Sequence, residues 1–190
     1  VTFEVENDSV ATGVNIKKAG PAQVVSGQPI QYTLTGIGNT STVPLASFYW
    51  RDTLPTQVIL TRIVTGTYNQ QLTYKIVYKT NLSGDTYLTL ADNLSTTQNY
   101  VLDASPVALG LAANEKATEF MVVFGQVKAG FAQVETPYVH GTVAQGLANN
   151  SSFVNVADVG GLYNGQWIMG VSRWVTSVYG KPEPLPRTGY

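Results

Sequence analysis

Three polar residues occupy strand positions whose alternation places their side chains on the core side. They are Lys18, with the parity of Val14 and Ile16, Asp52, with the parity of Phe48 and Trp50, and Asn155, with the parity of Phe153 and Ala157. Burying an unpaired charge is costly, so three such residues on separate strands need a joint explanation. Burial favours neutral forms, which lowers the pKa of a lysine and raises the pKa of an aspartic acid. A neutral amine is a nucleophile and a protonated carboxyl is an acid, so these residue types suit amide chemistry.

A second explanation of the same residues involves no reaction. Asn155 would satisfy backbone groups in the core, while Lys18 would extend to the rim and form an ion pair with Asp52. Two substitutes also stay open. Lys17 would become the nucleophile if the register moved by one residue, and Glu119 is another acid, although its parity opposes that of the apolar residues around it.

The elements that position these residues are short strands bounded by turn residues. Alternating or apolar runs predict strands at 14–18, 30–34, 46–52, 57–67, 72–78, 87–90, 119–124, 138–143, 153–157 and 166–179. Residues 35–44 are rich in Gly, Thr, Ser and Asn and indicate a loop, and 104–113 indicates a short helical or 3₁₀ turn. We therefore expect an all-β, immunoglobulin-like β-sandwich over residues 9–180, preceded by a lead segment, 1–8, and followed by an extended tail, 181–190.

The composition excludes several classes of function. The net charge is −1, from 11 Lys and Arg against 12 Asp and Glu, so no charge excess favours nucleic acid. There is no cysteine, which excludes disulfides and thiolate chemistry, and His140 is the only histidine, which excludes a multi-histidine metal site. The oxygens of Asp85, Asp92, Asn93 and Asp103 match no known calcium-loop spacing. We expect no cofactor and no metal.

The C-terminal residues carry a recognisable motif, Leu185-Pro186-Arg187-Thr188-Gly189. It resembles the Leu-Pro-x-Thr-Gly sorting signal of Gram-positive surface proteins. The resemblance implies that a sortase cuts between Thr188 and Gly189 and joins the Thr188 carboxyl to an amine of the cell wall or of another protein. The proline at the second position of the motif favours an extended chain, which suits presentation to an enzyme.

The family's apolar segment and basic tail do not follow the motif in this sequence. No stretch approaches the ~20 apolar residues of a membrane-spanning helix. Nor does a signal peptide precede Val1. We expect a recombinant or mature fragment from which both processing segments have been removed, with no membrane contact of its own.

Several short stretches resemble the conserved-repeat, immunoglobulin-like modules of bacterial surface proteins and pilin-like stalks. These stretches are Lys18-Ala19-Gly20-Pro21-Ala22, Gly27, Tyr32-Thr33-Leu34, Asp52-Thr53-Leu54-Pro55 and Asn155-Val156-Ala157. These stretches are short and are spread over most of the length of the chain. The resemblance implies a secreted module anchored to the cell wall.

Modules of this class often form a spontaneous Lys–Asn isopeptide bond with the help of a carboxylic acid. The resemblance assigns the amine to Lys18, the carboxamide to Asn155 and the acid to Asp52. Such a bond would close a loop of 155 − 18 = 137 positions. By analogy with a disulfide, it would stabilise the fold by on the order of 4–5 kcal/mol.

The sequence thus predicts a structural or adhesive module of a Gram-positive surface protein. It would be a substrate of sortase rather than an enzyme, beyond one autocatalytic turnover. Its partners would be sortase and either peptidoglycan or neighbouring surface-protein subunits. The alternative is a pilus subunit or adhesin tip that binds a host protein or glycan, which a broad exposed aromatic patch would favour. A hydrolase would need paired carboxylates or a nucleophile–base pair, and the sequence shows neither signature.

Overall fold

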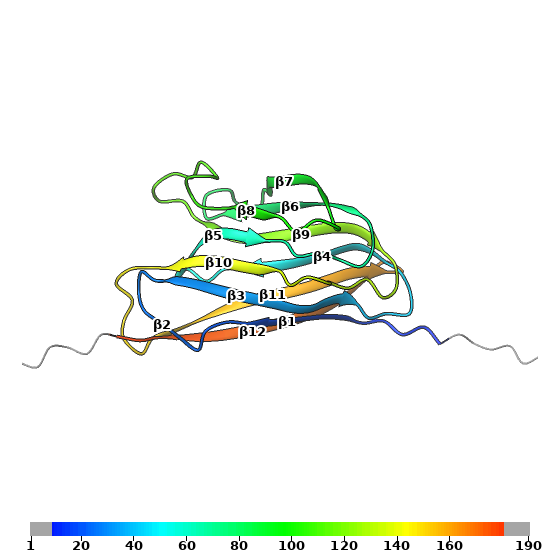
Figure 1. Ribbon diagram of the computed structural model, residues 1–190, viewed down its shortest axis with the longest axis horizontal. Coiled ribbons are helices and arrows are strands. Elements are labelled where there is room, and N and C mark those ends of the chain that lie inside the picture. The colour runs from blue at the N-terminus through cyan, green and yellow to red at the C-terminus, as the bar shows by residue number, and fades with distance from the viewer. Residues whose placement is uncertain (1–8, 181–190) are drawn as a thin grey trace, which may run out of the picture.

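Two β-sheets packed face to face make up the molecule, and their strands lie along its long axis (Figure 1). This computed structural model describes residues 9–180. The expected lead segment, 1–8, and the tail with the sorting motif at 185–189 lie outside the described residues.

The smaller sheet has five strands, all antiparallel. In spatial order they are β1 (Val14–Ala19), β3 (Pro29–Asn39), β10 (Tyr138–Val143), β5 (Val58–Val64) and β8 (Val101–Asp103). The larger sheet has seven strands, and only the short pairing of β2 with β12 is parallel. In spatial order they are β2 (Gln23–Val24), β12 (Gln166–Val178), β11 (Ser152–Tyr163), β4 (Leu45–Thr53), β9 (Ala117–Val127), β6 (Thr73–Thr80) and β7 (Leu88–Ser95). The predicted all-β, immunoglobulin-like sandwich is confirmed.

The hydrophobic core lies between the two inner sheet faces. Phe48, Trp50 and Phe120 enter it from the larger sheet, and Tyr32 and Leu34 enter it from the smaller sheet, all fully buried. Full burial of a side chain of this kind stabilises a fold by about 1.5–3 kcal/mol. Because β1, β4 and β11 bury the alternate residues that the sequence pattern predicts, they also carry their polar residues into this core.

Tyr68 shows how a buried hydroxyl is normally satisfied in this core. Its hydroxyl accepts a hydrogen bond from Trp50 Nε1 at 3.0 Å and donates one to the Thr65 carbonyl at 3.0 Å. Its ring stacks on Phe131 with the ring centroids 5.4 Å apart. Buried polar groups usually find partners in this way, which makes the exceptions described below informative.

The expected loop at 35–44 is wrong for its first residues, because β3 continues to Asn39. A bulge explains the error. Gly36 has a φ of +66°, in the left-handed region that favours glycine, and Asn15 Nδ2 donates a hydrogen bond to its carbonyl at 2.9 Å. The extra residue reverses the inside–outside alternation, so that Leu34 and Ile37 both face the core and the strand pattern is disguised.

The segment 104–113 forms hydrogen-bonded turns instead of a helix. Leu109 N donates to the Ser105 carbonyl at 3.0 Å, and Leu111 N donates to the Pro106 carbonyl at 2.9 Å. The short strands β2 and β8 were not predicted, because two or three residues are too few to show a period. Within residues 9–180, no helix has the length and hydropathy that crossing a membrane requires.

The two ends of the described chain lie at opposite ends of the long axis (Figure 1). The chain enters through β1 and leaves through β12, and these two strands lie close together across the side of the sandwich. Lys18 N donates a hydrogen bond to Ser172 Oγ at 2.9 Å, which links the end of β1 to the middle of β12. The first and last long strands are therefore neighbours, although they enter and leave at different ends.

Candidate functional site

Lys18 and Asp52 meet inside the sandwich, each contributed by a different sheet. Lys18 lies near the end of β1 and Asp52 near the end of β4. Lys18 Nζ donates a hydrogen bond to Asp52 Oδ2, and neither side chain has any exposed surface. The contact therefore joins the two layers of the sandwich in the absence of solvent.

Asn155 lies beside this pair on β11, the strand adjacent to β4. Ala157 is the register partner of Asp52, so Asn155 is two residues from that partner and points to the same inner face. Diagonal neighbours of this kind lie within reach of each other's side chains. Asn155 is fully buried, and its side chain is close enough to stabilise the charged form of Asp52. The structure thus gathers the three predicted residues in one part of the core.

Tyr32 completes the cluster from the smaller sheet. It lies on β3, two residues from Leu34, which is the register partner of Lys18. Its ring covers the Lys18 nitrogen, which is 4.5 Å from the ring centroid. The side chains of Asn155 and Thr176 lie next to its hydroxyl and favour its ionised form, whereas burial and the charge of Asp52 raise its pKa.

Burial sets the protonation of the central pair. Burial lowers the pKa of Lys18, opposed by the charge and hydrogen bond of Asp52. Burial also raises the pKa of Asp52, opposed chiefly by Lys18. Both shifts favour an uncharged amine beside an uncharged acid. This is the protonation state in which the amine is a nucleophile and the acid can donate a proton.

The cluster contains most of the unsatisfied polar atoms of the core. Within residues 9–180, five buried side-chain nitrogen or oxygen atoms have no hydrogen-bond partner, and four of them belong to Tyr32, Asp52 and Asn155. Both polar atoms of the Asn155 carboxamide are among them. An unsatisfied buried group costs about 1–3 kcal/mol. The concentration of such atoms at one place is the feature that a functional explanation must account for.

The non-reactive explanation holds only in part. Lys18 does pair with Asp52, but it is only 2% exposed and does not reach the rim. Asn155 was expected to satisfy backbone groups, yet neither of its side-chain atoms has a partner. A simple structural ion pair therefore accounts for Lys18 and one oxygen of Asp52 and leaves Asn155 unexplained.

The two substitute residues lie elsewhere. Lys17 is exposed on the outer side of β1, so it does not enter the cluster. Glu119 is on the outward face of the larger sheet, 3.7 Å from Arg51 Nε and 3.7 Å from Lys79 Nζ. Because Glu119 faces away from the core, Asp52 is the acid that stands beside Lys18.

The outward face of the larger sheet carries a different group of residues. Trp167, Met169, Val171 and Val175 form an exposed row along β12, with exposed fractions between 50% and 56%. We call these four side chains the β12 row. Trp167, Met169 and Val171 form its continuous apolar part, because the exposed Arg173 lies between Val171 and Val175.

A partly exposed ion pair, Arg51 with the buried Asp158, borders the β12 row. Arg51 donates two hydrogen bonds of 2.9 Å to Asp158, and the Tyr49 hydroxyl donates another at 2.9 Å. The Tyr49 and Trp167 rings meet edge to face with centroids 5.8 Å apart. Tyr49, Arg51 and Trp167, together with Tyr87 and neighbouring side chains, line a hollow of about 300 Å³.

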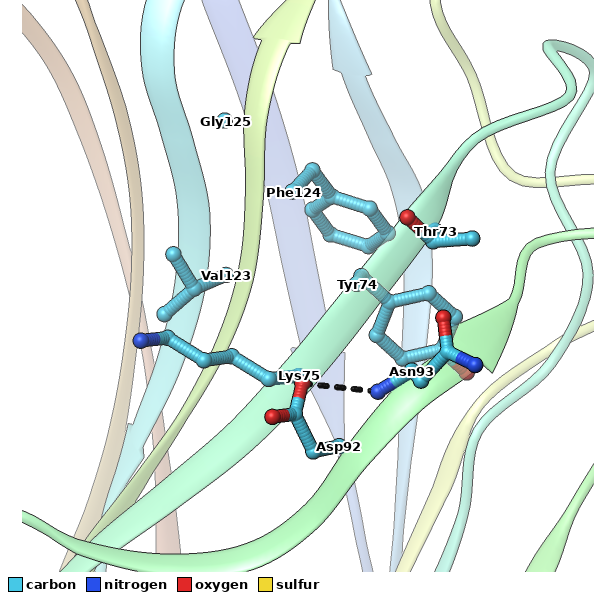
Figure 2. Close-up of a pocket in the computed structure, with 8 residues that line it drawn as sticks. All are labelled: Thr73, Tyr74, Lys75, Asp92, Asn93, Val123, Phe124 and Gly125. Atoms are coloured by element: carbon cyan, nitrogen blue, oxygen red, sulfur yellow. Dashed lines mark hydrogen bonds between the residues drawn. The ribbon is translucent and has the colours of Figure 1, made fainter.

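A second hollow of about 300 Å³ lies between β6, β7 and β9, and Figure 2 shows its lining. Lys75 and Asp92 are the charged residues of this lining. Asp92 accepts a hydrogen bond from the backbone nitrogen of its neighbour Asn93 at 2.7 Å, the dashed line of Figure 2. With a single carboxylate among its described residues, this hollow does not present the carboxylate pair of a glycosidase.

Comparison with known proteins shows only distant likenesses. Neither a family model nor a curated protein matches the sequence. Among solved structures, the collagen-binding subdomain of the Enterococcus faecalis surface protein ACE is 12% identical with a TM-score of 0.40, over 87% of this chain and 96% of that one. A Clostridium perfringens cohesin module is 12% identical with a TM-score of 0.43, over 89% and 98%. The collagen-binding domain of a Staphylococcus aureus adhesin is 12% identical with a TM-score of 0.37, over 90% and 100%. Likenesses this distant carry no function to this chain.

Sequence reasoning missed Tyr32 as a member of the site. Its parity with Ile30 and Leu34 correctly placed it in the core. Its position over Lys18 depends on the pairing of β1 with β3 and on their register, which a single sequence does not show. The available signal was a tyrosine among aliphatic residues, because a buried hydroxyl needs a partner.

Proposed function

We propose that this chain is a structural module of a bacterial surface protein whose two sheets are joined by an amide bond between Lys18 and Asn155. The observation that supports it most is the fully buried Lys18–Asp52 contact beside a carboxamide with no hydrogen-bond partner. A folded core rarely leaves such a group unsatisfied. The bond would give the carboxamide a role that packing alone does not supply.

The proposed reaction is an amide exchange in which every atom is accounted for. The neutral Lys18 amine attacks the Asn155 side-chain carbonyl carbon and forms a new carbon–nitrogen bond. Protonated Asp52 donates a hydrogen bond to the carbonyl oxygen and stabilises the charge that develops there. The bond from that carbon to Nδ2 breaks, a proton passes from the amine to the leaving nitrogen through Asp52, and one ammonia departs. No cofactor, oxidant or reductant is needed.

Intact mass tests the bond directly. Folded protein is expected to be lighter by one ammonia than the sum of its residues, and peptide mapping should place the link between Lys18 and Asn155. Asp52→Asn removes the acid and should restore the full mass. Asp158→Asn removes another buried carboxylate, on the outward face, and should keep the deficit. A full mass in correctly folded wild-type protein would contradict the proposal.

The rate of bond formation should depend on pH with a bell shape. The reaction needs a neutral Lys18 and a protonated Asp52, and burial shifts both pKa values towards these forms. At low pH the amine becomes protonated, and at high pH the acid loses its proton, so the rate falls on both sides. The measurement is the mass of unreacted protein, recovered unfolded from inclusion bodies, that is refolded across a pH series and quenched at successive times. A rate that is independent of pH would contradict the assigned roles.

We further propose that the module is anchored to the cell wall through its tail. The motif Leu185-Pro186-Arg187-Thr188-Gly189 supports this, and Thr188 would be the residue transferred. Incubation with a purified sortase and a glycine amine should release Gly189-Tyr190 and add the amine to Thr188. A Thr188→Ala variant is the control. Failure with sortases of several classes would count against anchoring and would leave the internal bond untouched.

The β12 row favours a second candidate function, adhesion to a host protein. Trp167 is half exposed in a strip of apolar side chains, which is the arrangement of a protein-binding surface. Immobilised collagen is a suitable first probe. Trp167→Ser should weaken binding about tenfold or more, as truncation of an interface tryptophan does. Val107→Ser, at a residue 92% exposed on a distant turn, should not. Equal binding of both variants would exclude the row as the contact surface.

A further inference from the structure

Tyr32 contacts the two reacting groups of the site but has no place in the reaction as written. Its ring covers the Lys18 nitrogen at 4.5 Å from the ring centroid. Its hydroxyl lies beside the Asn155 carboxamide and Thr176. The ring therefore faces the nucleophile and the hydroxyl faces the electrophile, on one rigid side chain.

The neighbours of Tyr32 define a direction for its hydrogen bonds. Thr176 Oγ1 already donates to the Pro21 carbonyl at 2.9 Å, so its oxygen is left as an acceptor. The Tyr32 hydroxyl can donate to that oxygen and accept from Asn155 Nδ2. If the carboxamide turns Nδ2 towards Tyr32, its opposite atom, Oδ1, becomes available to accept a hydrogen bond from the protonated form of Asp52. This is the orientation that lets the acid polarise the carbonyl.

The Tyr32 hydroxyl and both polar atoms of Asn155 have no partner within bonding geometry. Hydrogen bonds of reacting groups are often long or poorly aligned until the reaction complex forms. Burial and the charge of Asp52 also raise the pKa of Tyr32, so its hydroxyl stays protonated and acts through hydrogen bonds rather than by proton transfer.

We propose that Tyr32 is a positioning residue for the Lys18–Asn155 bond, whose ring shields the amine from water and whose hydroxyl orients the carboxamide. This inference rests on the proposed function, because it assigns a role within the same reaction. It adds a fourth residue, from β3, to a site that the resemblance limited to three. The hydroxyl contributes to the rate of the reaction and not to the stability of the fold.

The test compares how fast variants form the bond. Protein recovered unfolded from inclusion bodies is refolded by dilution, and intact mass is followed with time. Tyr32→Phe keeps the ring and removes the hydroxyl, so bond formation should slow roughly tenfold, the effect of losing one hydrogen bond in the transition state. Tyr74→Phe is the matched control, because Tyr74 carries the other unpartnered buried hydroxyl and lies on β6, outside the cluster. It should leave the rate unchanged.

A stability measurement separates positioning from a structural role. In an Asn155→Ala background, where no bond can form, Tyr32→Phe should leave the urea midpoint unchanged or raise it, because it removes an unpartnered polar atom. A lowered midpoint would show a structural role and overturn the inference, as would a Tyr32→Phe rate equal to that of wild type.

The same experiment keeps the two proposals apart. If wild-type protein shows the mass deficit and Tyr32→Phe acquires it equally fast, only the role of Tyr32 is overturned. If wild-type protein never shows the deficit, the Lys18–Asn155 bond is overturned and the role of Tyr32 with it.

Discussion

Asn155→Ala is expected to have the full mass calculated from its sequence, with no deficit of one ammonia, and to unfold at a much lower temperature than the wild-type chain. The bond would close a loop of 155 − 18 = 137 positions, and a cross-link over such a loop stabilises by about 5 kcal/mol. For a domain of this size each kcal/mol corresponds to roughly 2–4 °C, so the melting temperature should fall by about 10–20 °C. Calorimetry together with intact mass makes the measurement.

Another buried asparagine supplies the control for this prediction. Asn39 is 1% exposed, and its carboxamide is fully used, with Nδ2 donating to the Val43 carbonyl at 3.0 Å and Oδ1 accepting from Ser41 N at 3.0 Å. Asn39→Ala should therefore destabilise through lost hydrogen bonds while the protein keeps its mass deficit. If Asn155→Ala melts within a degree or two of wild type, the bond does not stabilise the fold as estimated.

Lys18→Met is expected to be more damaging than the loss of the bond alone. It removes the amine, so no bond forms, and it also leaves the Asp52 carboxyl in the core without its hydrogen-bond partner. Breaking a buried pair by removing one partner costs about 3–5 kcal/mol. The variant should therefore be less stable than Asn155→Ala by about that amount in urea unfolding. Lys18→Met/Asp52→Leu, which makes both positions apolar, should recover most of the difference.

The pH dependence of Lys18→Met identifies the cause of the damage. Burial already raises the pKa of Asp52 above its usual 3.8, and the charge of Lys18, which opposes this, is gone in the variant. An acid whose pKa is raised by folding contributes stability below its unfolded pKa, and that stability is lost as the pH rises through the folded pKa. Lys18→Met should thus become less stable with rising pH, whereas the double variant should not. A double variant as unstable as Lys18→Met would show that lost packing, not charge, dominates.

The alternation of inward and outward side chains along single strands accounts for most of what could be predicted from the sequence. Lys18, Asp52 and Asn155 each follow apolar neighbours at a spacing of two, and all three enter the core as expected. That rule is local, because successive side chains of a strand point to opposite faces. It also predicted that Lys17 and Glu119 face away, and the structure confirms both orientations.

The order of strands within the sheets could not be predicted in the same way. Asn155 lies beside Asp52 because β11 pairs with β4, and Tyr32 lies over Lys18 because β3 pairs with β1. Asn155 and Asp52 are more than a hundred positions apart in the sequence, and Tyr32 and Lys18 are fewer than twenty apart. No local pattern encodes either pairing. The Gly36 bulge had the opposite effect, because it reversed the alternation inside β3 and made a strand look like a loop.

The burial of Asp158 on the outward face of the larger sheet could not be predicted from the sequence for a related reason. Arg51 and Asp158 have the parity opposite to Asp52 and to Asn155, so alternation alone places both on the outward face. Asp158 is nevertheless only 6% exposed, because Arg51 and the Tyr49 hydroxyl cover it. Long side chains on a sheet surface can cover a charged residue that points outward from its strand. The inward–outward alternation of a single strand cannot reveal such burial.

The opposite placement of the two chain ends has a consequence for a module pulled along its length (Figure 1). With Lys18 tied to Asn155, tension would pass from β1 straight into β11 and out through β12. Residues 19–154, which number 154 − 19 + 1 = 136, would lie in a side loop that bears none of it. At about 3.3–3.6 Å per residue, these residues would span about 450–490 Å if fully extended, and the bond would prevent a pulled module from gaining that length. A string of such modules would lengthen under tension only through the residues outside the loop, so it would extend far less than a string without the bond.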